Sequence, residues 1–183
     1  MTDLVRRSAA VTATLVAVPV ALAIALISLL SYGAFSDPPA PTPTAPAVTT
    51  PVTMAAPALA AEAVSICQTV VSHLPDTAAG RTRRPVTAGA EQNAAYGDPP
   101  ITMACGTSQP TVEPTADVLT ISGVCWLAIP GTGGTAWTTV DRAIPVTITV
   151  PGAAEGSAQS VAPFSTAVAS ADPRADTAPS GCG

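Results

Sequence analysis

The 183-residue chain contains no lysine, and only 10% of its residues are charged. The absence of lysine excludes Schiff-base catalysis and the phosphate-binding lysine of a P-loop. The glycine-rich stretch Gly131–Gly134 therefore indicates a flexible hairpin loop and not a nucleotide site. The formal net charge of −5 opposes contact with phosphate backbones, which argues against a nucleic-acid partner. We expect no cofactor.

Histidine and aromatic residues are scarce as well. The single histidine, His73, falls on the polar face of a predicted helix, and no nucleophile-elbow pattern is present in the chain. A metal site is disfavoured because the chain has one histidine and no pair of cysteines with CxxC spacing. The sequence therefore predicts no catalytic residue and no metal ligand. Aromatic residues make up 3% of the chain, so its core must depend on Val, Ile, Leu and Ala.

One long hydrophobic run is present near the N-terminus. No side chain between Arg7 and Asp37 is charged, and the apolar stretch 9–30 is long enough to cross about 30 Å of hydrocarbon as a helix. Basic residues on one flank, with Tyr32 and Phe35 on the other, match a cytoplasmic anchor and an outer aromatic belt.

This pattern predicts a cytoplasmic tail (1–8), a single transmembrane helix within 9–35 and an extracytoplasmic C-terminal domain. The apolar core is longer than that of a usual secretory signal, which favours an uncleaved signal-anchor. Small residues at Ser31 and Gly33 leave a cleaved signal as the alternative. The predicted location is the cell membrane, with the N-terminus in the cytoplasm.

The remainder of the chain divides into a linker and one domain. Residues 36–61 are dominated by Pro, Ala and Thr, which predicts a semi-rigid extended spacer because proline removes backbone donors and fixes φ. Residues 62–183 are enough for a single domain with a modest core.

Four cysteines lie in this domain, on the predicted outer side of the membrane, where thiols become oxidised. We prefer the pairing Cys67–Cys105, because Cys67 lies on the apolar side of a predicted helix and Cys105 ends a strand expected to pack on it. This leaves Cys125–Cys182, which would tie down the C-terminus. Four cysteines allow three pairings.

Hydrophobic periodicity predicts two helices and several strands. The break at Ser122-Gly123 within an apolar run fits either a tight hairpin or a bulge. The expected fold is α+β, with a small antiparallel sheet covered on one face by two helices. The predicted helices are 59–74 and 162–171, the second with Pro163 in its first turn, and the predicted strands are 101–105, 118–129 (with the break), 137–140 and 146–150.

Two segments are candidate ligand or partner surfaces. Gly97-Asp98-Pro99-Pro100 enforces a turn, which could present Tyr96 and Asp98 on a rigid rim. Arg81, Arg83 and Arg84 lie in a predicted polar loop and could bind an anionic polymer or lipid headgroup. A turn and a solvated loop with no ligand are the simpler interpretations of both segments.

A series of short motifs runs through most of the domain. The motifs are Cys67, Leu74-Pro75, Arg83-Arg84, Tyr96 to Ile101, Cys105-Gly106, Pro110, Gly123-Val124, Trp126-Leu127, Trp137-Thr138-Thr139, Arg142 and Val150-Pro151. In this order they resemble a family of small actinobacterial envelope proteins labelled only as a domain of unknown function. The resemblance implies one N-terminal membrane segment or signal and a single compact domain, with no known activity, substrate or cofactor. Tyr96 stands where tryptophan is expected and Cys125 is not a position of that family, so the resemblance does not support the second disulfide.

These observations favour a non-enzymatic, membrane-anchored module that binds a cell-wall polymer or an envelope protein. The alternative is an enzyme or accessory subunit acting on cell-wall precursors, with carboxylates such as Asp98 in a pocket that also contains Tyr96 and Arg142. A third hypothesis is a structural spacer with no ligand.

Overall fold

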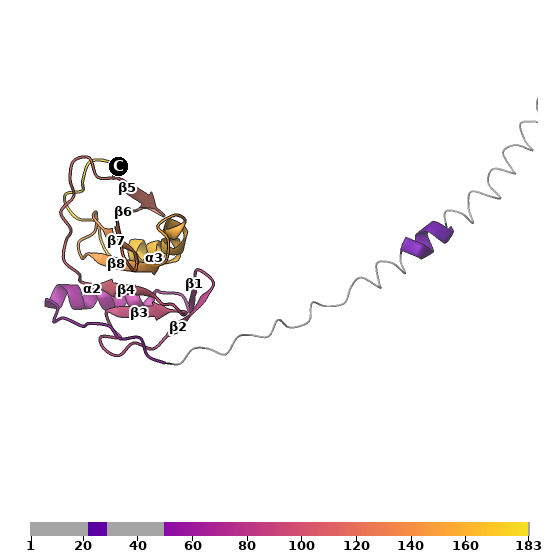
Figure 1. The fold of residues 1–183 in the computed structure, drawn as a ribbon, viewed down its shortest axis with the longest axis horizontal. Helices are drawn as coiled ribbons and strands as arrows, with labels where there is room; N and C mark the ends of the chain where they lie inside the picture. The colour runs from indigo at the N-terminus through magenta and orange to yellow at the C-terminus, as the bar shows by residue number, and fades with distance from the viewer. Residues whose placement is uncertain (1–21, 29–49, 183) are drawn as a thin grey trace, which may run out of the picture. The chain divides into compact units, whose positions relative to one another are not determined.

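The computed structural model describes residues 22–28 and 50–182 (Figure 1). The chain divides into two compact units, Met1–Ala45 and Pro46–Gly183. The predicted cytoplasmic tail and most of the predicted anchor lie outside the described residues.

The first unit is described only at residues 22–28, which are helical. Four large apolar side chains in this segment are more than 60% exposed, namely Leu22, Ile24, Leu26 and Ile27. Within the described parts of the chain, no helix has both the length and the apolar character needed to cross a membrane.

The second unit begins with helix α2 (Ala61–Ser72), close to the predicted helix 59–74. Its buried side chains recur at helical spacing, as the sequence pattern requires. The helix ends at Ser72 with His73 as its C-cap, and Pro75 follows, where the chain cannot continue a helix.

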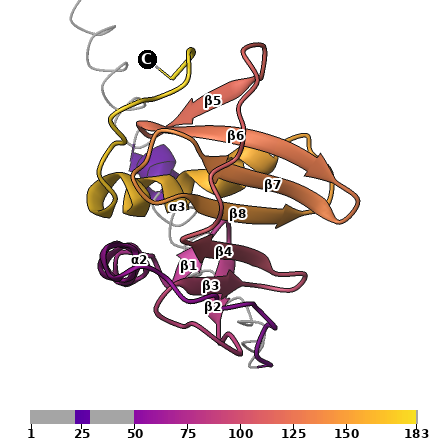
Figure 2. The ribbon, with the colours of Figure 1, turned by 90° about the vertical axis from the view of Figure 1, so that its left-hand side faces the viewer.

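Eight strands form one antiparallel sheet in the order β1-β2-β3-β4-β8-β7-β6-β5. The strands are β1 (Thr77–Ala78), β2 (Arg81–Arg84), β3 (Asn93–Tyr96), β4 (Ile101–Cys105), β5 (Val118–Ile121), β6 (Val124–Gly131), β7 (Gly134–Thr139) and β8 (Val146–Pro151). Figure 2 shows them from β5 at the upper edge to β2 near the lower edge. The expected α+β class is confirmed.

The break at Ser122-Gly123 is a two-residue hairpin turn, because Ile121 pairs directly with Val124. Both turn residues have positive φ, 49° and 78°, as a type I′ turn requires. The hairpin alternative is therefore confirmed, and the bulge alternative is wrong.

Three strands lie where the sequence predicted none. The arginine-rich segment is strand β2 and not a loop, because it pairs with β3 on one side and with β1 on the other. Strand β3 contains Asn, Ala and Ala before Tyr96, residues with little intrinsic preference for strands, so only its neighbours in the sheet reveal it.

Helix α3 (Ser157–Ala171) begins five residues before the predicted start at Ala162. Gly156 precedes it with a left-handed φ of 78°, and the Ser157 hydroxyl donates to the Ala154 carbonyl at 2.7 Å. Pro163 is therefore inside the helix and not in its first turn. Because proline has no N–H, one carbonyl of the preceding turn loses its helical partner.

The core lies between the two helices and one face of the sheet. Side chains of α2 and α3 share one buried cluster with residues of β3, β4, β6, β7 and β8. At its centre the rings of Tyr96 and Phe164 meet edge to face, with centroids 5.3 Å apart.

Two indole groups hold α3 on the sheet. The indole N–H of Trp126 donates to Ser165 Oγ at 3.0 Å, and that of Trp137 donates to Ser157 Oγ at 3.1 Å. All four side chains are buried, so these hydrogen bonds fix the helix in position as well as satisfying the donors.

The folded unit extends N-terminal of residue 62, the boundary expected from the sequence. Val52 forms a parallel bridge with Val86, and the Asn93 side-chain amide donates to the Ala55 carbonyl at 2.8 Å. Residues 50–60 include only two prolines, and Val52 and Met54 keep backbone N–H groups that donate to Pro85 and Thr87. The segment therefore packs beside the strand connection although its composition is typical of a linker.

Candidate functional site

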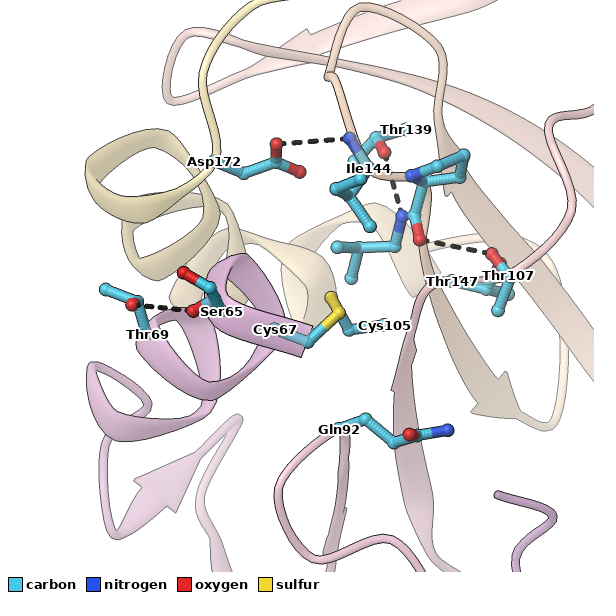
Figure 3. The surroundings of a disulfide bond; sticks show 12 residues. Ser65, Cys67, Thr69, Gln92, Cys105, Thr107, Thr139, Ile144, Thr147 and Asp172 are labelled. Atoms are coloured by element: carbon cyan, nitrogen blue, oxygen red, sulfur yellow. Dashed lines mark hydrogen bonds between the residues drawn. A yellow bond between two sulfur atoms is a disulfide. The ribbon is translucent and has the colours of Figure 1, made fainter. Parts of the chain in front are cut away.

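Two disulfides are present, with the predicted pairing. Cys67–Cys105 joins α2 to the last residue of β4, and Cys125–Cys182 joins β6 to the C-terminal segment. The Cα atoms are 5.5 Å apart in both, which is normal for a disulfide. Figure 3 shows the first one between the helix and the sheet. Two disulfides in one small domain are typical of an extracytoplasmic protein.

The three arginines of the predicted ligand surface, Arg81, Arg83 and Arg84, donate hydrogen bonds to backbone carbonyls within the domain. The Arg84 guanidinium donates to the Gly97 carbonyl at 2.8 Å and to the Thr50 carbonyl at 2.6 Å, and it lies 3.8 Å from Asp98 Oδ1. Its side chain is 8% exposed. Arg84 therefore connects three segments: the start of the folded unit, strand β2 and the turn after β3.

The other two arginines also bind backbone carbonyls. Arg81 donates to Pro99 in the turn after β3, and Arg83 donates to Val71 in the last turn of α2 at 3.5 Å. A guanidinium close to the last carbonyls of a helix is favoured by the helix dipole. The structure thus brings Arg81, Arg84 and Asp98 together, with much of their hydrogen-bonding capacity already used inside the protein.

Tyr96 and Asp98 have opposite environments. The Tyr96 side chain is completely buried, its hydroxyl donates to the Pro75 carbonyl at 2.8 Å, and burial raises its pKa above the usual value. Tyr96 is therefore a core residue and not part of a rim. The Asp98 side chain is 68% exposed, at the tip of the turn.

His73 lies at the end of α2, as expected, and is exposed. Its Nδ1 is 2.7 Å from the Thr69 carbonyl one turn earlier. Ser72 Oγ also lies 3.5 Å from this Nδ1, but the Ser72 hydroxyl donates to the same Thr69 carbonyl at 2.8 Å. Both contacts therefore belong to the helix terminus.

A buried group of charges, of which the sequence pattern singled out only Arg142, lies where α3 ends. Asp141, Arg142 and Asp172 are 2%, 5% and 1% exposed, and Arg142 Nε is 3.3 Å from Asp141 Oδ1. Arg142 also donates to the carbonyls of Asp172 and Gly123. The group therefore joins the end of α3, the β7–β8 connection and the β5–β6 turn.

Asp172 is the least satisfied member of this group. Its Oδ1 accepts the Ile144 N–H at 3.2 Å, as Figure 3 shows, while Oδ2 has no partner among the described residues. Burial raises the pKa of Asp172 to about 6, although the Ile144 hydrogen bond and nearby Arg142 oppose the shift. Within the described residues, no group of three His, Cys, Asp or Glu side chains is arranged to hold a metal ion.

Strand β5 is an open edge of the sheet. The Cys125 N–H donates to Asp141 Oδ1 and the Cys125 carbonyl accepts from Val140, so both groups point away from β5. Thr120 pairs with Cys125, and its own N–H and C=O must therefore point away from β6. The same alternation applies to Val118, and neither residue's outward groups have a partner among the described residues.

Side chains next to this edge are apolar or small. Leu119 is 46% exposed on the face that α3 covers elsewhere, and Thr120 is exposed on the other face. Strand β5 itself has no charged side chain and no proline, the usual means of blocking an edge strand.

The other edges are blocked in part. At the far side of the sheet, β1 covers β2, and the Arg83 N–H donates to the Asp76 carbonyl at 2.8 Å. Strand β6 extends beyond β5, but on that stretch Pro130 has no N–H to offer. Within β5 itself, Val118 and Thr120 hold the open backbone groups. In the sequence, the Ser122-Gly123 pair indicated a hairpin at this place. Which side of β5 has no neighbouring strand follows only from the order of the strands in the sheet.

Comparison with known proteins identifies a family and no more. The family model described as "Protein of unknown function (DUF3515)" matches residues 16–177. Neither the curated proteins nor the solved structures contain a match to the chain.

Proposed function

The chain belongs to the DUF3515 family of proteins of unknown function, and we propose that it is a membrane-anchored extracytoplasmic module that binds a partner protein through the edge of its sheet. The observation that carries the proposal is the set of unpaired backbone groups on β5, next to the half-exposed Leu119. An exposed strand edge is a ready template for an added strand. The proposal includes the location that the sequence resemblance implies, which is the cell envelope of an actinobacterium.

The location is supported by the two disulfides and by the apolar N-terminal run. Disulfides persist in oxidising compartments and are rare in the cytosol. The helical segment 22–28 exposes large apolar side chains around its surface, as a helix in lipid does. An uncleaved anchor accounts for both observations, with the disulfide-bonded unit outside and the tail 1–8 inside.

A protein partner is better supported than a wall polymer. Sugar rings commonly stack on exposed aromatic side chains, and within residues 50–182 all four aromatic side chains are buried (Tyr96, Trp126, Trp137 and Phe164). The arginines expected to bind an anionic polymer are largely engaged with backbone carbonyls. Strand addition needs neither feature, since backbone hydrogen bonds supply the contact.

The enzyme alternative required Tyr96, Asp98 and Arg142 around one pocket. Tyr96 is bonded to Pro75 inside the core, and Arg142 is bonded to Gly123 and Asp172 at the end of α3. These residues belong to separate hydrogen-bond networks. The same geometry favours a binding protein over a catalyst.

Amide hydrogen exchange on the full-length chain tests the binding function. The exchange of β5 is compared in native membrane vesicles and in the purified protein in detergent. We expect the Val118 and Thr120 amides to exchange at least tenfold more slowly in the native membranes, because a bound strand would occupy them. Equal exchange in both preparations would refute partner binding at this edge.

Extraction and protease treatment test the location independently. The chain should stay in the membrane pellet at alkaline pH, and external protease should reach residues 50–182 on cells without an outer wall. Leu26→Arg should weaken anchoring, whereas Leu26→Ile should not, because a charge within an apolar span is costly. Release of the wild-type chain by alkali would contradict the anchor.

A further inference from the structure

We propose that the partner of β5 is a second copy of the same chain, paired antiparallel with Leu119 opposite Leu119 of the second copy. The inference rests on the proposed function, which supplies the anchored chain and the binding edge. In this arrangement the two sheets would join through their β5 edges, and the open edge at the top of Figure 2 would disappear.

The backbone groups of β5 match those of a second β5. Val118 and Thr120 each present one N–H and one C=O on the free side. When Leu119 lies opposite its counterpart, Val118 of each copy lies opposite Thr120 of the other. The symmetric pair then forms about four hydrogen bonds and leaves none of these groups open.

The side chains are self-complementary in this register. Leu119 would occupy a non-hydrogen-bonded position, where opposite Cβ atoms lie about 5 Å apart and side chains contact directly. It is 46% exposed in the single chain, on the same face in both copies, so pairing removes apolar surface from water. A two-fold axis through this position makes the interface isologous.

Charge also permits this register. Asp117, directly before β5, would lie opposite Ile121 of the second copy. The two Asp117 side chains would be roughly 14 Å apart along the strands, at a rise of about 3.4 Å per residue. This exceeds the Debye length of about 8 Å at physiological salt, so their repulsion is largely screened. A register that placed the two acids opposite each other would be destabilised.

The small contact predicts a weak pair that depends on the membrane. A four-residue edge buries much less than the roughly 800 Å² per partner of a standard interface. Two chains anchored in one membrane meet at a much higher effective concentration than free chains. Because the chain has a formal net charge of −5, added salt should strengthen or leave unchanged the contact between copies and should weaken contact with a basic partner.

The test uses the purified full-length chain reconstituted alone in liposomes at two protein-to-lipid ratios. Amide exchange of Val118 and Thr120 should be at least tenfold slower at the high ratio than at the low one. Exchange in the interior strands should not depend on the ratio. Exchange of Val118 that is equal at both ratios would overturn the second copy as partner.

Two variants separate pairing from folding. Thr120→Pro removes an N–H that points away from β6, so the β5–β6 hairpin should persist. The Val118 amide should then lose its density-dependent protection, which is the slower exchange at the high protein-to-lipid ratio. In the control Thr120→Val, the hairpin and this protection should both remain. Leu119→Arg places like charges opposite each other and should also abolish that protection. Retained protection in either Thr120→Pro or Leu119→Arg, with native tryptophan fluorescence, would refute the proposed register.

Failures of the two proposals are distinguishable. Protection of Val118 in native membranes but not in liposomes containing the chain alone would mean that another protein supplies the strand, which overturns the second copy and keeps the binding function. Absence of protection in both would overturn both proposals.

Discussion

The two disulfides differ in what they hold, and removing each in turn tests this account of the domain. The perturbations are the paired variants Cys67→Ala/Cys105→Ala and Cys125→Ala/Cys182→Ala. The first bond joins α2 to β4 within the main core, and the second joins β6 to the C-terminal segment.

Chain entropy alone predicts nearly equal losses. The bonds close loops of 38 and 57 residues. In the chain-entropy treatment these loops correspond to about 3.9 and about 4.2 kcal/mol, so the second bond would contribute slightly more.

The structure predicts the reverse ranking. Cys67 and Cys105 are 0% and 2% exposed between α2 and the sheet, so removing two sulfur atoms adds cavities at about 1 kcal/mol each, for a total near 6 kcal/mol. Cys125 and Cys182 are also buried, at 0% and 6% exposed, so the difference comes from the C-terminal segment that holds Cys182. Without the second bond, the segment after Ala175 can detach locally. The freed residues then regain about 1 kcal/mol or more each of backbone entropy, which offsets part of the loss. We expect a net loss of about 2–3 kcal/mol for the second variant.

Guanidinium titration of the full-length chain in mild detergent measures both losses. The chain has two tryptophans, Trp126 and Trp137, and both are buried, so their fluorescence reports the folded domain. Because domains are stable by about 5–15 kcal/mol, the first variant should be largely or marginally unfolded, and the second should stay folded with a lower midpoint. An equal or larger loss in the second variant would refute the local-detachment argument and support the entropic one.

Three further predictions concern single side chains. Because the pKa of Asp172 is raised to about 6 from its usual 3.8, the native state retains this proton more strongly than the unfolded chain does, so wild-type stability should fall relative to Asp172→Asn as pH rises from about 4 through 6. The two-unit shift, discounted for solvent screening, predicts a fall of about 2 kcal/mol in guanidinium titrations, and a constant difference between the two proteins would contradict it. Ser165→Ala leaves the buried Trp126 N–H without its acceptor and should lower the unfolding free energy by about 1–3 kcal/mol; a loss below about 0.5 kcal/mol would show that the bond does not hold the helix. Arg84→Gln removes the donor to the Thr50 carbonyl and should speed amide exchange of residues 50–56 about tenfold with β6–β8 unaffected, whereas unchanged exchange would mean that other contacts hold this segment.

Elements with strong local patterns could be predicted from the sequence. Helix α2 and strands β4 and β8 have apolar residues at periods that match their geometry, and their bounds were close. The disulfide Cys67–Cys105 followed from placing one cysteine on the apolar face of that helix and the other at the end of a strand. Both inferences used contacts that the local pattern already implied.

Features that depend on distant neighbours could not be predicted in this way. Strand β2 has three charged side chains and becomes a strand through its pairing with β3. Tyr96 looked like a rim residue because of the turn that follows it, but its strand position directs the ring at Phe164, which lies 68 residues later in the sequence. The charges of Asp141 and Asp172 come together only when α3 ends beside the β7–β8 connection.

The second disulfide and the open edge are two parts of one arrangement. Cys125 is the cross-strand neighbour of Thr120, and Val118 packs against the small buried cluster that contains Cys125 and Cys182. The Cys125–Cys182 bond therefore stabilises the position of β5 on the side opposite its open edge. Arg142 supports the same hairpin by donating to the carbonyl of Gly123. A strand that is held rigid before binding loses less conformational entropy when a partner pairs with it. The variant lacking Cys125–Cys182 should therefore lose the density-dependent protection of Val118 in liposomes even though its tryptophan fluorescence remains native. If protection persists at wild-type strength, the bond serves the C-terminal segment alone and contributes nothing to the edge.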